Sequence, residues 1–408
     1  MKRRISLVLS AAVLVSLFAG CASESTDPAQ ETVQSGTEAA AAAVPEYKTT
    51  HTLYFKDSTK SGKAAATFFN SDSGKSEEVE MKKVGESDDS VTFSCEGNCA
   101  EYNTVSIKHG DATTPKLAFN PCISGWYQSD KEVLPYTEGK ETTYEPDFEE
   151  ITLTCIDYDK PVYIWKPDDY DPTSSEKYST IYLLDGQFIM YTGKYGQVRE
   201  DCTDAIEQID AMISSTGQKA IVVAVDNVGK RDFELVPNIG VPMDKTDFEY
   251  EGTDGTKFAE FVGKTLVPYI QEHYNVCTDA LHTSLAGVSL GGMESFYIAQ
   301  EYPEIFGTVG SFSPSFWEYD DETWSEYLSG KTFGGDSPFV YFYTGPKEFD
   351  TDPHVTDMYN RLKKLGYPES RLVLHFNEDG AHGGVYWRAV FSEFLAAMIY
   401  QCVEPLQK

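Results

Sequence analysis

The sequence predicts two folded parts in series: a small all-β domain, expected to be a sandwich, and a larger α/β domain with a mainly parallel central sheet. Residues 46–139 form short alternating runs separated by Asp, Ser, Gly and Lys turns, which is typical of closely spaced antiparallel strands. Beyond residue 148, continuous apolar runs alternate with helical stretches. We therefore expect a flexible linker at 22–45, the β-sandwich at 46–147 and the α/β domain at 148–408.

Composition predicts a folded chain and excludes one class of partner. Of the 408 residues, 41% are hydrophobic, and the 26 Tyr, 23 Phe and 5 Trp provide ample apolar surface for a core. Acidic residues outnumber basic residues by 65 to 33, which gives a net charge of −32. Such a charge repels phosphate backbones, and no basic stripe interrupts it, so we expect no nucleic-acid partner.

The N-terminus has the pattern of an export signal. Basic residues at 2–4 precede an apolar run at 5–19, which at 15 residues is shorter than the roughly 20 that span a membrane. The run ends in Leu-Phe-Ala-Gly-Cys21, which resembles a bacterial lipobox except for Phe18. We expect a lipoprotein-type signal peptide at 1–21 and a lipid anchor on Cys21 at the extracellular face of the bacterial cell membrane. Cleavage of an ordinary signal peptide, followed by secretion, is the alternative.

The β domain distantly resembles small carbohydrate-binding modules. The resemblance rests on two strand motifs, Tyr54-Phe55-Lys56 and Phe68-Phe69-Asn70. Aromatic faces can stack on the C–H groups of sugar rings, so the domain is a candidate carbohydrate-binding module. The alternative is that Tyr54, Phe68 and Trp126 fill the sandwich core.

Seven cysteines follow Cys21. An odd number leaves at least one free thiol or an intermolecular bridge in an oxidising compartment. Cys95 and Cys99 lack the CxxC spacing of zinc knuckles and a matching His pair, so a disulfide or buried thiols are expected there rather than a metal. The pairing of the cysteines stays open.

Apolar runs at 180–184, 220–225 and 339–344 are expected as strands of the central sheet, covered on both faces. Apolar residues at helical spacing predict a helix over 258–274. We expect a local kink at Pro268, because proline lacks the N–H that a helix interior needs.

One short motif predicts a nucleophile. Residues 287–292 read Gly-Val-Ser-Leu-Gly-Gly, between an expected strand at 283–286 and an expected helix at 293–302. In this strand-turn-helix context, Gly-x-Ser-x-Gly is a nucleophile elbow that exposes Ser289 Oγ at the top of the sheet. The N–H of Leu290, at the start of the helix, then serves as an oxyanion donor.

A base and an acid are expected after later strands. His382 lies in a loop rich in small residues between an expected strand at 371–376 and a C-terminal helix, which favours it as the general base. The loop after the strand at 339–344 offers the carboxylates of Glu348, Asp350 and Asp352. The order serine, acid, histidine is the order found in α/β-hydrolases.

The α/β domain resembles the putative-esterase family of α/β-hydrolases, which includes S-formylglutathione hydrolase-like, enterochelin esterase-like, and feruloyl or acetyl-xylan esterase-like domains. The motifs that carry the resemblance stand at 162–167, 181–187, 226–227 with Arg231 and 234–235, 267–270, 287–292, 306–307 with 311–317, and 381–382 with Trp387.

The resemblance implies a catalytic triad of Ser289, His382 and an acid, with no metal and no organic cofactor. The family's usual acid position falls on Glu348, with Asp350 as the rival. The second oxyanion donor falls on the backbone N–H of Gln187, although the His-Gly-Gly-Gly version of that motif is absent.

These observations predict an exported serine esterase that removes acyl or feruloyl groups from plant polysaccharide. A siderophore esterase of the enterochelin type is the alternative, although ferric catecholates are anionic and basic residues are scarce near the expected site. A third possibility is a non-catalytic surface binding protein on a hydrolase scaffold. Fold resemblance alone does not supply the substrate.

Overall fold

The computed structural model describes most of the two predicted domains. The described residues are 50–70, 73–98, 101–102, 104–114, 117–118, 125–127, 134–135, 146–190, 203, 205–243, 252–348, 351–377 and 380–400. The predicted signal peptide at 1–21, the linker at 22–45, Asp350 and the side chain of Trp126 lie outside this description. Within it, no helix is both long and apolar enough to cross a membrane.

The first part of the described chain forms one sheet of nine strands. Hydrogen-bonded neighbours follow the order β6-β5-β2-β3-β4-β1-β8-β9, and β7 pairs with β5. The pairs are antiparallel except that of β1 with β8. The strands are β1 (Thr50–Asp57), β2 (Ala64–Phe69), β3 (Ser76–Glu86), β4 (Val91–Asn98), β5 (Thr104–His109), β6 (Ala112–Thr113), β7 (Leu117–Ala118), β8 (Gly125–Tyr127) and β9 (Leu134–Pro135).

The long strand β3 makes this a single sheet, where the sequence analysis expected a sandwich of two. β3 pairs with β2 along 76–81 and with β4 along 82–86, and a β-bulge between Lys83 and Gly85 shifts the register in the second half. No turn interrupts its 11 residues, so both halves of the sheet share it. Buried residues of both halves nevertheless form one core, which includes Leu53, Phe55, Ala66, Phe68, Met81, Phe93, Val105 and Ile107.

The aromatic residues expected as a sugar platform divide between two environments. Phe68 is 1% exposed and belongs to the core, as the core-filling alternative expects. Tyr54 is half-buried. Sugar binding by this domain stays a prediction.

Cys95 is a free, buried thiol. Burial raises the pKa of this thiol to about 12.

The rest of the described chain is built on an eight-stranded sheet in the order β10-β11-β13-β12-β14-β15-β16-β17. β10 and β11 form an antiparallel hairpin, which the sequence analysis did not predict, and β11 joins β13 antiparallel. All other neighbours are parallel. The strands are β10 (Phe148–Cys155), β11 (Tyr158–Trp165), β12 (Ser179–Leu183), β13 (Ala220–Val225), β14 (Thr283–Val288), β15 (Thr308–Phe312), β16 (Phe339–Thr344) and β17 (Leu372–Phe376).

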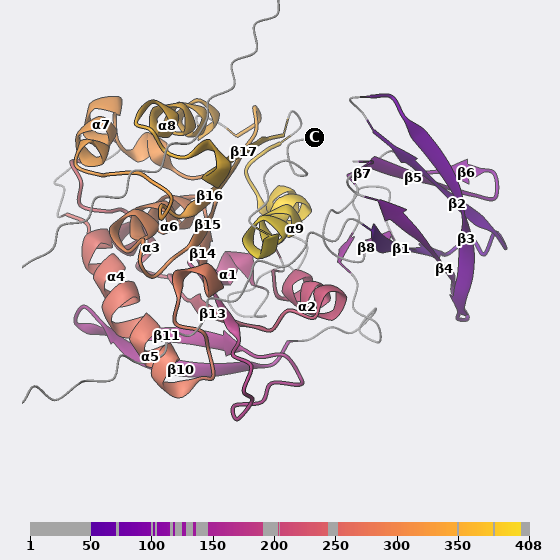
Figure 1. Ribbon diagram of the computed structural model, residues 1–408, viewed down its shortest axis with the longest axis horizontal. Coiled ribbons are helices and arrows are strands. Elements are labelled where there is room, and N and C mark those ends of the chain that lie inside the picture. Colours follow the sequence, from indigo (N-terminus) through magenta and orange to yellow (C-terminus); the bar gives the residue numbers. More distant parts are fainter. Residues whose placement is uncertain are drawn as a thin grey trace, which may run out of the picture. The chain divides into compact units, whose positions relative to one another are not determined.

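Helices cover both faces of this sheet (Figure 1). Alternate strand residues therefore enter two separate cores: Tyr182 packs with the helices α4 to α8, whereas Ile181 and Leu183 pack with α2 and α9. Continuous apolar strands suit this arrangement because neither face meets water. The helices are α1 (Gly186–Ile189), α2 (Ala205–Thr216), α3 (Arg231–Glu234), α4 (Gly255–Phe261), α5 (Val267–His273), α6 (Leu290–Glu301), α7 (Asp321–Ser329), α8 (Thr351–Lys364) and α9 (Gly384–Tyr400).

The helix predicted over 258–274 contains an irregular turn next to Pro268. A π-helical turn at Val262–Leu266 separates α4 from α5, and Pro268 stands in the first turn of α5. Proline cannot donate a backbone hydrogen bond. The hydrogen bonds of the helix therefore change from the α to the π pattern in the turn before Pro268.

The parallel strands bring their carboxyl ends to one edge of the sheet. Asp185 follows β12, Asp226 follows β13 and Ser289 follows β14. Glu348 and His382 lie in the loops after β16 and β17. Ligands of open α/β sheets bind outside this edge, so the sheet gathers the predicted site residues on the side where a substrate is expected.

Close packing of β14 against α6 depends on Gly287. A Cβ added to Gly287 would lie 2.2 Å from the carbonyl oxygen of Gly291. We predict that Gly287→Ala lowers the free energy of unfolding by about 3 kcal/mol or prevents folding, because the clash is with backbone that cannot move aside. Denaturant unfolding of the purified variant measures this.

Gly330→Ala is the matched control, because a Cβ added at Gly330 meets no atom within 4 Å and its φ of −84° suits any residue. It should change the free energy of unfolding by less than about 0.5 kcal/mol. Equal stability of the two variants would contradict the packing argument.

Candidate active site

Ser289 stands at a sharp turn between β14 and α6. Its φ of 58° and ψ of −123° are unusual for a residue with a side chain and persist only where the surroundings hold them. The Ser289 N–H donates to the Phe312 carbonyl at 2.9 Å, and the Ser289 carbonyl accepts from the N–H groups of Met293 and Ser315, both at 3.1 Å. Ser289 Oγ lies 3.4 Å from Ser315 Oγ. The strand, turn and helix expected around this serine are therefore present.

His382 and Glu348 face one another. His382 Nδ1 lies 3.7 Å from Glu348 Oε2, which is an ion-pair distance longer than a hydrogen bond. The Glu348 side chain is fully buried, and neither of its carboxylate oxygens has a hydrogen-bond partner among the described residues. A buried carboxylate without hydrogen bonds is costly, and a positive charge that forms beside it lowers that cost.

Among the described residues, no hydrogen bond joins Ser289 to the imidazole of His382. Catalytic hydrogen bonds are often long or poorly aligned until a substrate is bound. The structure thus brings two of the three predicted triad side chains into contact and places the third at the same edge of the sheet.

The loops that carry the acid and the histidine are tied together. The N–H of Lys347 donates to the carbonyl of Gly380 at 3.0 Å. Trp387, at the start of α9, packs edge-on against the ring of His382 with centroids 5.1 Å apart, and its Nε1–H donates to Ser313 Oγ at 2.7 Å. The position of the histidine is therefore set by its own loop and by α9.

The two predicted oxyanion donors have different surroundings. Leu290 is the first residue of α6, so its N–H has no acceptor within the helix and lies at the positive end of the helix dipole. The side chain of Gln187 is already engaged: its Nε2 donates to Asp185 Oδ1 at 2.8 Å, and its Oε1 accepts from the Asn227 N–H at 3.1 Å. Only the backbone N–H of Gln187 can act as the predicted donor.

Asp185 links the two segments that carry the predicted oxyanion donors, the start of α1 and the start of α6. Its fully buried carboxylate accepts from Arg231 Nε at 2.8 and 3.0 Å and lies 2.8 Å from Arg231 Nη2. The N–H of Gly291 and the side chain of Gln187 also donate to it. Burial raises the pKa of Asp185 above its ordinary value, although the Arg231 charge opposes this rise. One carboxylate therefore connects the start of α1, the start of α6 and the guanidinium.

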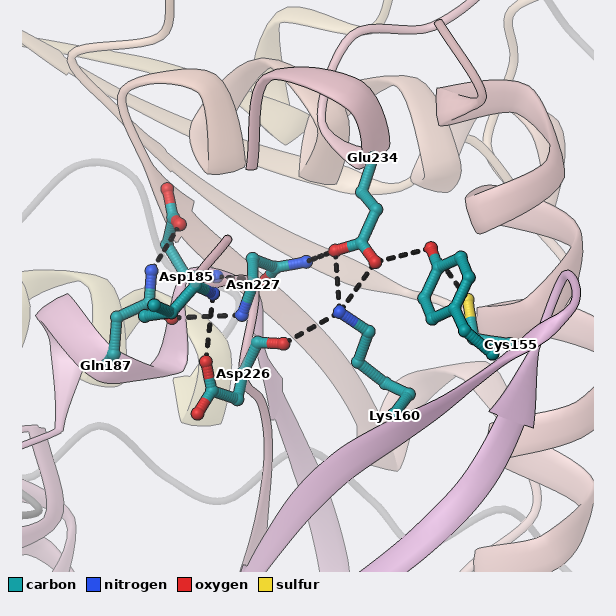
Figure 2. A network of polar contacts seen from close by, with 9 residues as sticks. Cys155, Lys160, Asp185, Gln187, Asp226, Asn227 and Glu234 are labelled. Carbon is teal, nitrogen blue, oxygen red and sulfur yellow. Dashed lines mark hydrogen bonds and ion pairs between the residues drawn. The ribbon is translucent and has the colours of Figure 1, made fainter. Parts of the chain in front are cut away.

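A buried polar network continues from Asp185 to Lys160 of β11 (Figure 2). The N–H of Asp185 donates to Asn227 Oδ1 at 2.9 Å, and Asn227 Nδ2 donates to Glu234 at 2.8 Å. Figure 2 shows Lys160 of β11 between Glu234, at 2.6 and 2.8 Å, and the backbone carbonyl of Asp226, at 2.9 Å. These contacts fasten the loops after β12 and β13 to the hairpin.

Sequence reasoning assigned no role to Lys160, Asn227, Glu234 or Glu294. Asn227 and Glu234 stand in motifs that carry the family resemblance, so a signal existed for them. The sequence carries no such signal for Lys160, because a lone lysine at the start of a strand is usually exposed to solvent. Glu294 of α6 is fully buried. Its pKa is raised well above the ordinary value, mainly by burial and in smaller part by the charges of Glu234 and Glu301.

Comparison with known proteins finds similarities to the α/β part of the chain. Residues 155–332 match the sequence model of the family described as "Putative esterase". This part of the chain is similar to that esterase family. The iron(III) salmochelin esterase of Escherichia coli O6:H1 is 30% identical over 173 residues, which cover 38% of this chain and 41% of that protein. The protein YbbA of Bacillus subtilis is 26% identical over 148 residues, covering 35% of this chain.

The match spans only 58% of YbbA, so these relatives do not by themselves assign an activity to the whole protein. Among solved structures, the chain resembles the enterobactin esterase of Shigella flexneri, crystallised in the presence of enterobactin. The TM-score is 0.50 at 16% identity, with 85% of this chain and 92% of the other covered. At that identity the likeness shows a shared α/β-hydrolase-like fold and nothing about substrate.

The contribution of the buried Lys160–Glu234 ion pair to stability is open to test. We predict that Lys160→Met lowers the free energy of unfolding by about 3–5 kcal/mol, because it leaves the Glu234 charge buried with no cation. Changing Glu234 to Gln in the same variant should recover part of the loss, since the uncompensated charge is then absent. Thermal and denaturant unfolding measure both.

Lys264→Met serves as the control, because Lys264 and Glu260 form an exposed pair, at 62% and 56% exposure, on one helical face. Such a pair contributes less than about 0.5 kcal/mol. If Lys160→Met destabilised the protein no more than Lys264→Met, the network would not hold these loops.

Proposed function

We propose that this protein is an exported serine esterase that hydrolyses carboxylic esters, with acyl or feruloyl esters of plant polysaccharide as its substrates. One observation carries the proposal: Ser289, at positive φ between β14 and α6, shares the carboxyl edge of the parallel sheet with the paired His382 and Glu348. The match of residues 155–332 to the esterase family model supports the same reaction class.

The first half of the proposed reaction acylates the serine. Ser289 Oγ attacks the ester carbonyl carbon while His382 takes the hydroxyl proton. The carbonyl oxygen becomes an oxyanion that accepts from the N–H groups of Leu290 and Gln187. The tetrahedral intermediate collapses, the ester C–O bond breaks, and the leaving alcohol takes the proton from His382.

The second half returns the enzyme to its starting state. Water attacks the acyl carbon and gives its proton to His382, and the bond to Ser289 Oγ breaks as the serine regains that proton. The buried Glu348 carboxylate stabilises the imidazolium that forms in both halves. This role suits a group that lies 3.7 Å from Nδ1 and has no competing hydrogen bond among the described residues.

The surroundings of Gln187 favour an aromatic acyl group. Phe188, the next residue, is 44% exposed, and the Arg231 guanidinium lies 5.5 Å from its ring centroid. An exposed ring beside a cation suits stacking of a phenolic ring such as that of a ferulate. The N-terminal signal pattern, through Cys21, supports export and a lipid anchor, and the β domain is the candidate carbohydrate-binding part.

A siderophore esterase is the second candidate, favoured by the similarity to the iron(III) salmochelin esterase. The same Phe188–Arg231 pair would accept a catechol ring. Against it, Asp185 already neutralises Arg231, and the chain carries a net charge of −32, so attraction for a strongly anionic ferric catecholate is weak.

A substrate panel tests these proposals. We predict that the purified protein hydrolyses methyl ferulate and p-nitrophenyl acetate, and that Ser289→Ala lowers kcat by at least about 10⁴-fold because the nucleophile is lost. His382→Ala should have a comparable effect. Acetylated xylan and a ferric catecholate trilactone complete the panel, and product release is followed by chromatography.

Ser315→Ala is the matched control, since it removes the neighbouring hydroxyl and should cost less than about tenfold. A kcat/KM for the ferric trilactone more than tenfold above that for methyl ferulate would favour the siderophore alternative. Absence of turnover on all four compounds by folded protein would make the chain a binding protein on a hydrolase scaffold.

The identity of the triad acid is tested separately. We predict that Glu348→Gln lowers kcat by roughly 10²–10⁴-fold while Asp350→Asn costs less than about tenfold, because only one carboxylate can hold the imidazole tautomer. Steady-state kinetics on methyl ferulate measures both. The reverse order of losses would identify Asp350 as the acid.

A further inference from the structure

A cluster of three potential metal ligands lies at the opposite edge of the sheet from Ser289. Cys277, Asp279 and His282 occupy the loop between α5 and β14, and one ligand atom from each lies within 4.8 Å of the other two. β14 then runs six residues to the nucleophile elbow. At about 3.3 Å per residue, the cluster is roughly 20 Å from Ser289, so the proposed ester hydrolysis does not use it.

The backbone of this loop is held at three points. The N–H of Cys277 donates to Tyr178 at 2.9 Å, and the carbonyl of Asp279 accepts from Thr283 Oγ1 at 2.9 Å. The carbonyl of Ala280 accepts from the N–H of Gly307 at 2.9 Å. A Cβ at Gly307 would lie 2.3 Å from that carbonyl oxygen, so the loop packs as closely as glycine allows. The three candidate ligand side chains are therefore carried by a loop whose backbone is already held in place.

The three side chains are accessible, and two of them are already in contact. Asp279 Oδ1 lies 2.7 Å from His282 Nδ1, and the two side chains are 49% and 20% exposed. Cys277 is a free thiol and is half-buried. A metal ion can reach the loop from solvent without the core opening.

We propose that Cys277, Asp279 and His282 bind one Zn²⁺ ion, with water as the fourth ligand, and that the ion stabilises the fold rather than taking part in catalysis. Sulfur, imidazole nitrogen and carboxylate oxygen are the ligands that zinc prefers. A single carboxylate cannot supply the six to eight oxygens that Ca²⁺ takes. Around a tetrahedral zinc these atoms would stand about 3.4–3.6 Å apart, a small adjustment from their present separations.

Binding requires a defined proton balance. The Cys277 thiol loses its proton to solvent and binds as the thiolate, while the imidazole stays neutral, with its proton on the ring nitrogen that faces away from the metal. Burial, followed by the Asp279 charge, raises the pKa of Cys277, and the Lys177 charge opposes this rise. Zinc offsets the rise because it is the larger local charge.

Cobalt provides a direct test. The purified full chain is treated with chelator and reductant and then titrated with Co²⁺. We expect one Co²⁺ per chain, with thiolate-to-cobalt charge-transfer absorption that disappears when Zn²⁺ is added. We also expect Zn²⁺ to raise the midpoint of thermal unfolding by several degrees. No stoichiometric uptake, or uptake without the charge-transfer band, would overturn the proposal.

Variants assign the ligands. Cys277→Ser should abolish the charge-transfer band, and Asp279→Asn and His282→Gln should each weaken Co²⁺ binding by at least about tenfold, since even outer-sphere partners contribute 10–100-fold. His273→Gln, which changes an exposed histidine of the adjoining helix, should bind as the wild type does. Cys277→Ala, checked by circular dichroism, replaces the serine variant if that one fails to fold.

Hydrolysis of p-nitrophenyl acetate separates this proposal from the proposed esterase function. Below the unfolding midpoint, we expect the zinc-free and zinc-loaded proteins to have the same kcat. Loss of kcat on removal of zinc would overturn the structural role. If no esterase activity exists, the cobalt and stability measurements still decide the metal site.

Discussion

The close approach of β14 and α6 at Gly287 is the constraint on which the candidate site depends. No side chain fits between Gly287 and the carbonyl of Gly291, and a Cβ on Gly292 would lie 3.0 Å from the Phe312 carbonyl oxygen of β15, a tight but milder contact. This contact starts the helix immediately after the strand, which forces Ser289 into its positive φ. The hydroxyl consequently projects beyond the sheet edge, and the first N–H groups of the helix are directed to the same place.

The loops around the elbow are held mainly by buried charge. Asp185 with Arg231, and Lys160 with Glu234, join the loops after β12 and β13 to one another and to the start of α6. Buried ion pairs contribute little net stability compared with apolar residues of the same size, because desolvation offsets their attraction. Their directional hydrogen bonds do fix loop positions, and the candidate oxyanion donors require defined positions.

The two edges of the central sheet serve different purposes. The carboxyl edge carries Ser289, Glu348 and His382. Its buried acid has no hydrogen-bond partner among the described residues and its serine is at strained φ, both of which cost stability. The opposite edge carries the tightly packed loop around Cys277, where Gly307 allows backbone-to-backbone contact. Strain near the chemistry is thus compensated by packing in the two cores and at the far edge.

The sequence by itself determined the features that depend on neighbouring residues. The elbow around Ser289 could be predicted because Gly-x-Ser-x-Gly is contiguous, and the strands β12, β13 and β16 came within one residue of their bounds because buried strands are continuous apolar runs. Only the tertiary structure decided what depends on residues distant in the chain. It placed Glu348 against His382, inserted Lys160 between Glu234 and Asp226, and joined the first domain through β3 into a single sheet. These outcomes follow from strand order and from the loss of solvent around buried charges, neither of which a local pattern of residues specifies.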